Sequence, residues 1–274
     1  MSDAKNVASI YDARSEQYDV NQVHVKQAQD FVEWANLKSG QSVLDLACGT
    51  GHVALGAKQV VGTSGHVIGV DISEGMLKVA SRKAKAADLD VTLIKNDITD
   101  LSGLDLLPAG SEGFDVITCA SALVLLQDPL QAVKHWKSLL RTNGCLITDV
   151  LTTDANAVMT IFAAIAPELG ESVPWDAQRW QSKAVLEQLM IDAGLHVDKI
   201  FETKAYATTH MDRDMGSKLF HEAIENSMYK NFGKEAIREK ANTLFLRKFA
   251  EITGETGSID EETRYWVVIA IKRE

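Results

Sequence analysis

The feature that most constrains this chain is an apolar run over residues 42–46 that leads into the glycine-rich turn Gly49-Thr50-Gly51. Two glycines one residue apart let the backbone turn sharply and approach a ligand that a Cβ would repel. Asp45 comes just before this turn, so we expect its carboxylate at the mouth of a ligand site. The pattern predicts a buried strand that delivers a glycine loop to a nucleotide-like ligand.

Two further apolar runs also end in acidic residues. Residues 66–71 end at Asp71, which follows Gly51 by 71 − 51 = 20 positions. At this spacing, a carboxylate after the second strand can accept from both hydroxyls of a ribose. A third run ends in the polar pair Asn96-Asp97, which can accept from an exocyclic amine. Together these acids favour an adenosine-containing ligand.

The glycines alone do not identify that ligand. Residues 49–54 also fit the dinucleotide pattern, with alanine in the third glycine position. The carboxylate of Asp45 would repel a pyrophosphate and attract an ammonium group. The sequence therefore favours a cofactor with an ammonium group over NAD, and an NAD-dependent oxidoreductase stays the weaker alternative.

These motifs resemble the class I methyltransferases that use S-adenosyl-L-methionine, and within them the ubiquinone and menaquinone C-methyltransferases. The resemblance spans roughly residues 10–150. It implies an α/β fold with a Rossmann-like, seven-stranded, mostly parallel sheet, helices on both faces and a helical cap over the acceptor site. It also implies S-adenosyl-L-methionine as the cofactor.

The resemblance assigns a part of the cofactor to each segment. The glycine loop would carry the methionyl group, Asp71 the ribose, and Asp97 with Ile98 the adenine. Residues 119–121 would face the methionine and the acceptor, and Tyr18 would close over the cofactor. The cofactor-binding residues that we predict are Tyr18, Asp45, Ala47, Gly49, Gly51, Asp71, Ile72, Met76, Asn96, Asp97, Ile98, Cys119 and Ser121.

The sequence departs from the family where relatives often carry histidines after the fourth strand, because residues 122–126 are all apolar. No catalytic residue is therefore predicted. Methyl transfer from a reactive sulfonium can depend on the alignment of donor and acceptor rather than on a strong general base. The expected reaction is methyl transfer to a small-molecule O, N, S or C nucleophile. The alternative is a protein of this fold that binds the cofactor and catalyses a non-methylating reaction.

Composition limits the partners. The chain has 28 Lys and Arg against 38 Asp and Glu, and this net charge of −10 disfavours binding to nucleic acid. Three cysteines are too few for a disulfide framework or a spaced zinc site, so we expect no metal and a reducing cytoplasm. We expect neither a signal peptide nor a membrane span, because the first residues lack an apolar core of signal-peptide length and no apolar run approaches about 18 residues. The expected state is a cytoplasmic monomer or homodimer with a small-molecule acceptor and no membrane partner.

The periodicity divides the chain into three regions: an N-terminal lid and helices (1–40), a cofactor-binding core (41–151) and a cap with the last two sheet strands (152–274). Residues 11–25 are predicted to form a mobile lid. Candidate acceptor-binding residues in the cap are Trp175, Trp180, His210 and His221. The expected strands are 42–47, 66–71, 91–96, 114–119, 145–150, 196–204 and 264–272, and the expected helical segments are 73–87, 128–143, 154–193 and 212–253.

Overall fold

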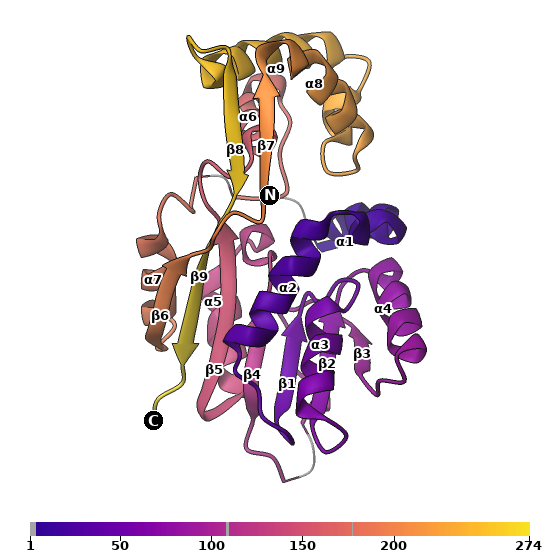
Figure 1. The fold of residues 1–274 in the computed structure, drawn as a ribbon, viewed down its shortest axis with the longest axis vertical. Coiled ribbons are helices and arrows are strands. Elements are labelled where there is room, and N and C mark those ends of the chain that lie inside the picture. The colour runs from indigo at the N-terminus through magenta and orange to yellow at the C-terminus, as the bar shows by residue number, and fades with distance from the viewer. Residues whose placement is uncertain (1–3, 108–109, 177) are drawn as a thin grey trace.

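The computed structural model describes residues 4–107, 110–176 and 178–274, which form a sheet with helices on both faces and a cap above one end (Figure 1). The main sheet has seven strands in the order β3-β2-β1-β4-β5-β9-β6, and only β9 runs antiparallel to its neighbours. This arrangement confirms the predicted α/β fold. The strands are β1 (Ser42–Leu46), β2 (His66–Asp71), β3 (Thr92–Lys95), β4 (Phe114–Cys119), β5 (Leu140–Leu151), β6 (His196–Glu202) and β9 (Tyr265–Ile271).

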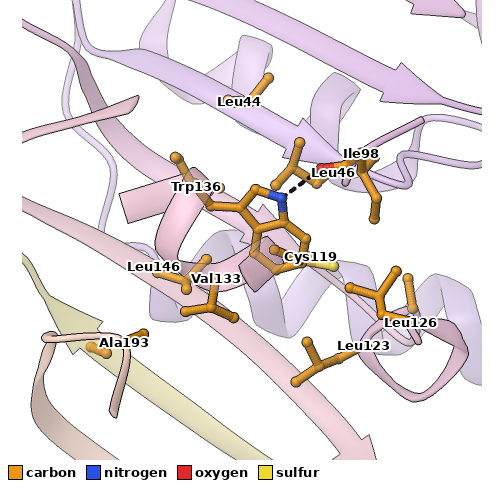
Figure 2. Close-up of a cluster of buried hydrophobic side chains, with 14 of the residues drawn as sticks. Leu44, Leu46, Ile98, Cys119, Leu123, Leu126, Val133, Trp136, Leu146 and Ala193 are labelled. Carbon is orange, nitrogen blue, oxygen red and sulfur yellow. Dashed lines mark hydrogen bonds between the residues drawn. The ribbon is translucent and has the colours of Figure 1, made fainter. Parts of the chain in front are cut away.

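Helices cover the sheet because its strands are apolar on both faces. Helices α2 (Gln22–Trp34) and α3 (His52–Val61) pack on one face, and α5 (Pro129–Leu139) and α7 (Lys183–Asp192) pack on the other. Trp136 of α5 is fully buried in the second layer and donates from its indole nitrogen to the Ile98 carbonyl at 2.7 Å (Figure 2). This bond ties the loop after β3 to the core.

Side-chain caps start two of the predicted helices. Ser73 accepts from the Met76 amide at 3.1 Å at the start of α4 (Glu74–Ala86). Asp128 accepts from the Gln131 amide at 3.0 Å at the start of α5. The predicted stop of α5 at residues 143–144 is wrong, because the helix ends at Leu139 and Leu140 already pairs with β4.

The cap is a separate layer with its own core. Helices α6 (Ala157–Ile165), α8 (Gly216–Glu225) and α9 (Arg238–Thr253) pack around buried phenylalanines such as Phe162 and Phe245. A two-stranded antiparallel sheet of β7 (Ala207–Asp212) and β8 (Ser258–Thr263) joins this cap to the main sheet (Figure 1). The sequence did not predict this pair of strands, and the helical segments in the cap region are shorter than expected.

Helix α1 (Ala4–Arg14) and the 3-10 turn η1 (Ser15–Val20) lie between the core and the cap, over the carboxyl ends of the core strands (Figure 1). The N-terminal region therefore reaches the edge of the sheet at which ligands bind in doubly wound folds. Among the described residues, no helix is long and apolar enough to cross a membrane. The remaining short 3-10 turns are η2 (Leu123–Leu125), η3 (Pro167–Leu169), η4 (Arg213–Met215) and η5 (Lys230–Gly233).

Candidate functional site

A cavity of about 430 Å³ lies at the carboxyl ends of the core strands, beneath α1. Ala4, Val7 and Tyr11 of α1 form part of its wall. A smaller cavity of about 50 Å³ lies beside the glycine loop and extends to His24 and Gln27 of α2. Nine of the predicted cofactor residues line the larger cavity: Tyr18, Ala47, Gly49, Asp71, Ile72, Met76, Asp97, Ile98 and Ser121.

Asp71 connects the second strand to the glycine loop. Its carboxylate accepts from the Gly49 amide and from the Ser73 amide, each at 2.8 Å. Burial raises the pKa of Asp71, and these two backbone bonds partly oppose the rise. Asp71 thus fixes the loop while its carboxylate lines the larger cavity. This position suits a carboxylate that also accepts from ligand hydroxyls.

The two loop glycines have different roles. Both adopt left-handed backbone angles, with φ of +54° at Gly49 and +84° at Gly51. A Cβ at Gly49 would meet no atom within 4 Å and would point into open space, whereas a Cβ at Gly51 would lie 3.0 Å from the Ala80 side chain. Gly49 therefore leaves room for a ligand, and Gly51 leaves room for the packing of α4 on the loop.

Asp45 does not lie at the mouth of the site, so this prediction is wrong. Its side chain is 1% exposed, and its carboxylate accepts from the Ala54 amide at 3.0 Å and from the Thr118 hydroxyl at 2.8 Å. Burial raises the pKa of Asp45 to about 7 against these two hydrogen bonds. Asp45 lines only the smaller cavity. Its visible role is to bind the first turn of α3 to the sheet.

Three other predicted residues lie outside the walls of the larger cavity. The Asn96 side chain donates to the Asp100 carbonyl at 2.7 Å and closes the turn after β3. Cys119 is fully buried within the core, and Gly51 lies under α4. Asp97 does line the cavity, and its carboxylate accepts from the Thr99 amide at 2.9 Å.

Sequence reasoning missed a buried polar network behind Ser121. Asp149 of β5 is fully buried and accepts from the Ser121 amide at 2.7 Å and from the Gln27 side chain. Burial raises the pKa of Asp149 to about 7 against these hydrogen bonds. Ser121 has a φ of +56°, which costs free energy for a residue with a side chain. The network holds this strained residue where it lines both cavities.

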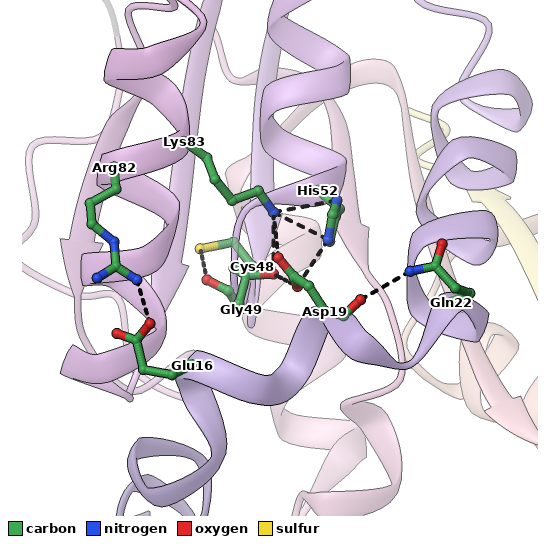
Figure 3. A network of polar contacts seen from close by, with 9 residues as sticks. Glu16, Asp19, Gln22, Cys48, Gly49, His52, Arg82 and Lys83 are labelled. Atoms are coloured by element: carbon green, nitrogen blue, oxygen red, sulfur yellow. Dashed lines mark hydrogen bonds and ion pairs between the residues drawn. The ribbon is translucent and has the colours of Figure 1, made fainter.

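Polar contacts fasten the N-terminal segment to the glycine loop (Figure 3). Asp19 accepts from the Thr50 hydroxyl at 2.5 Å and lies 3.1 Å from the Lys83 ammonium and 3.0 Å from His52. Burial alone would raise the pKa of Asp19, but the hydrogen bonds from Thr50 and Lys83 leave it below its usual value. These contacts place Tyr18, one residue earlier, against both cavities.

The predicted acceptor-binding residues separate into two groups. Trp175 and Trp180 are buried and line a third cavity of about 310 Å³ between η2 and α6. His210 and His221 lie on exposed surfaces of the cap and line none of the three cavities described here, so the structure does not bring them to the site. The carboxylates of Asp260 and Asp212 raise the pKa of His210, which stabilises its charged form on the surface.

Comparison with known proteins identifies the family. A sequence model of the methyltransferase domain matches residues 37–194. The chain belongs to this family. Demethylmenaquinone methyltransferase from Listeria welshimeri is 27% identical over 229 residues, which cover 75% of this chain and 94% of that protein. The predicted resemblance is confirmed, and the chain is an S-adenosyl-L-methionine-dependent methyltransferase that acts on a small-molecule acceptor.

Solved structures show the same fold in proteins of different activity. Magnesium protoporphyrin IX methyltransferase from Synechocystis, with bound SAM, has a TM-score of 0.56 at 14% identity, and the match covers 100% of this chain and 98% of that chain. A 4+2 cyclase has a TM-score of 0.61 at 15% identity, with coverage of 99% and 97%. At this identity the likeness shows the fold alone, so the choice of acceptor must be argued from the site.

Proposed function

We propose that this methyltransferase methylates a small aromatic acceptor of the hydroquinone type. The demethylmenaquinone methyltransferase to which the chain is similar supports this class of acceptor. The aromatic and apolar walls contributed by Leu125 and Leu126 in the larger cavity, and by Trp175 and Trp180 in the third cavity, suit a planar apolar ring.

The larger cavity carries the proposal, because it extends from the glycine loop to the segment after β4. Asp71 would hold the ribose hydroxyls, Asp97 the adenine amine, and the open space at Gly49 would receive the methionyl chain. When bound, S-adenosyl-L-methionine supplies a methyl group on a sulfonium, and this methyl passes to the acceptor nucleophile while the bonding electron pair stays on sulfur. The residues from Ser121 to Leu126 would then face the acceptor.

The side chains around this site favour catalysis by positioning. Ala122, Leu125 and Leu126 line the larger cavity and have no group that titrates. His24 lines the smaller cavity, but burial lowers its pKa to about 4, so its imidazole is a weak base at neutral pH. We propose that the protein aligns donor and acceptor and excludes water, and that the acceptor itself is the nucleophile.

We also propose that the three regions of the chain have different functions. Residues 1–40 would cover the cofactor, residues 41–151 would bind it, and residues 152–274 would shape the acceptor site. Hydrogen bonds between these regions support joint action, such as that from the Tyr206 hydroxyl to Asp30 at 2.6 Å. All three cysteines are free, which supports a cytoplasmic setting.

The test is transfer of a labelled methyl group from S-adenosyl-L-methionine to a panel of hydroquinones, phenols, thiols and amines. We expect transfer to hydroquinones. Trp175→Leu should raise the KM for the acceptor because it removes an aromatic wall, whereas Trp266→Leu on β9 should not. Preferential transfer to thiols or amines, or no transfer to any class, would contradict the proposal.

A further inference from the structure

An unpaired cation lies beside the cofactor cavity. The guanidinium of Arg14 lies 5.7 Å from the ring centre of Tyr11 and 5.4 Å from that of Tyr18. The side chain is half-buried, and it makes no hydrogen bond or ion pair with any other residue in the described part of the chain. A partly desolvated cation without an anion is costly, and cation–π contacts offset only part of that cost. An anionic ligand at this position would offset the charge of Arg14.

Three tyrosines lie near this cation. Tyr11 and Tyr18 line the larger cavity, and Tyr229 approaches from the cap, where its ring packs 4.7 Å from Phe162. Burial raises the pKa of each tyrosine, and the charge of Arg14 acts in the opposite direction on all three, which places them within its electrostatic reach. Among the described residues, none of these hydroxyls has a hydrogen-bond partner. They remain neutral donors at physiological pH.

The cap and the lid meet at this point. The Ser227 hydroxyl donates to the Ile10 carbonyl at 2.9 Å, which joins the loop before Tyr229 to helix α1. Trp175, which lines the third cavity, packs edge-on against Tyr229 with ring centres 5.8 Å apart. The cluster thus lies between the cofactor cavity and the cap wall. Tyr18 also borders the smaller cavity beside the glycine loop, whereas Tyr229 reaches the third cavity through Trp175, on the side that we propose for the acceptor.

No acidic side chain in the described part of the chain forms an ion pair with Arg14. Asp71 raises the pKa of Tyr11 and Tyr18, but its carboxylate is already bonded to the amides of Gly49 and Ser73. Glu261 raises the pKa of Tyr229 and accepts from the Ala157 amide in the cap. Arg14 therefore lies where the N-terminal segment meets the cap, beside Tyr11 and Tyr18 on the wall of the larger cavity.

We propose that Arg14, with the hydroxyls of Tyr11, Tyr18 and Tyr229, forms an oxyanion site that binds the acceptor in its ionised form, as a phenolate or enolate. This inference rests on the proposed function and names the charge state of its acceptor. The acceptor releases its proton to bulk water when it binds, so no side chain has to remove it. The site explains how the apolar segment 122–126 can lack a base, because the bound oxyanion is already nucleophilic.

The test uses the hydroxynaphthoquinone lawsone, an acidic enol that is coloured and anionic at neutral pH, and its uncharged methyl ether. Binding of both is titrated to protein saturated with S-adenosylhomocysteine. Arg14→Met should weaken lawsone binding by about 10- to 100-fold and leave the ether within about twofold, because only the anion loses a charge-assisted bond. Arg14→Lys should retain part of the affinity for lawsone.

Two controls separate this role from a structural one. Tyr229→Phe keeps the ring that packs on Phe162 and should still weaken lawsone more than the ether. Arg273→Met removes an exposed charge at the far end of the chain, where Arg273 bonds Asn143, and should change neither affinity.

The same titrations contain the outcomes that would overturn the proposal. Equal losses for lawsone and its ether, or no loss for either in Arg14→Met, would overturn it. A tenfold loss of S-adenosylhomocysteine affinity would also overturn it, by assigning Arg14 to the cofactor carboxylate. If anion binding depends on Arg14 as expected but labelled methyl never reaches a hydroquinone, the proposed function fails and the anion site stands.

Discussion

Asp71→Asn should weaken the binding of S-adenosylhomocysteine. The carboxylate lines the cofactor cavity and is 7% exposed, so hydrogen bonds from ribose hydroxyls to it would be charge-assisted and little screened by water. Loss of that charge should reduce the binding free energy of S-adenosylhomocysteine by about 1–3 kcal/mol, or raise its Kd roughly 5- to 150-fold. Isothermal titration calorimetry measures the change directly.

The same substitution also disturbs the free protein, which calls for a matched control. Asp71 accepts from two backbone amides, so its variant should unfold at a lower temperature. Asp115 is a similar acid, which accepts from the Ser42 amide at 2.8 Å and from Arg141 at 2.7 Å, but it lines none of the three cavities. Asp115→Asn should lower Tm without changing affinity. Unchanged affinity in a folded Asp71→Asn protein would refute the ribose assignment.

The pH dependence of binding gives an independent check on Asp71. Burial raises the pKa of Asp71 above its ordinary value, and the ligand bonds require the ionised form. Affinity for S-adenosylhomocysteine should therefore fall as the pH decreases through this raised pKa, and the fall should be smaller in Asp71→Asn. Identical pH profiles for the two proteins would contradict this reasoning.

Three further predictions concern the loop, the buried acids and the lid. Gly49→Ala should lower the affinity for S-adenosylhomocysteine and reduce the free energy of unfolding by only about 1–2 kcal/mol. Gly51→Ala should mainly lower Tm, and calorimetry measures both effects. The reverse pattern would contradict the roles assigned to the two glycines of the loop. Folded Asp149 and Asp45 keep a proton up to about pH 7 that the unfolded chain releases near pH 4, so stability should fall as pH rises between these values. Asp149→Asn should flatten that slope in urea unfolding, and an unchanged slope would count against the raised pKa. Hydrogen exchange over residues 11–25 should slow when S-adenosylhomocysteine binds, and equal exchange would remove the lid from the mechanism.

The sequence predicted the parts of the fold whose signals are local. The strand over residues 66–71 and the helix after Ser73 were recognisable because periodicity, a cap and a turn occur within a few residues of one another. The β7–β8 pair was not recognisable, because both strands carry mainly polar side chains and His210 pairs with Asp260 across about fifty intervening residues. Only tertiary pairing produces these strands, so neither one shows in its own sequence.

The site was predictable to a similar extent. Residues on the glycine loop and at strand ends could be placed together because the carboxyl ends of parallel strands meet at one edge of the sheet. Asp149 was missed because an acid inside an apolar strand gives no sign of its partner, and Gln27 lies 122 positions earlier in the chain. Arg14 and Tyr229 were not singled out for the same reason, since the roles that we propose for them depend on how the N-terminal segment and the cap meet.

The contacts of the N-terminal region also indicate where a lid would hinge. Asp19 bonds to the core through side chains that keep about a third of their surface exposed, and ion pairs of this kind contribute about 0–1 kcal/mol. Gln27 instead bonds to the buried carboxylate of Asp149, and breaking such a contact leaves an unsatisfied buried acceptor at a cost of about 1–3 kcal/mol or more. Helix α2 should therefore stay on the sheet while α1 and η1 detach. Asn21, which caps α2 by accepting from the Val23 amide at 3.0 Å, marks the boundary between them. A lid that opens for cofactor exchange would then comprise the residues before Asn21, which carry Tyr11, Arg14 and Tyr18 away from the site together.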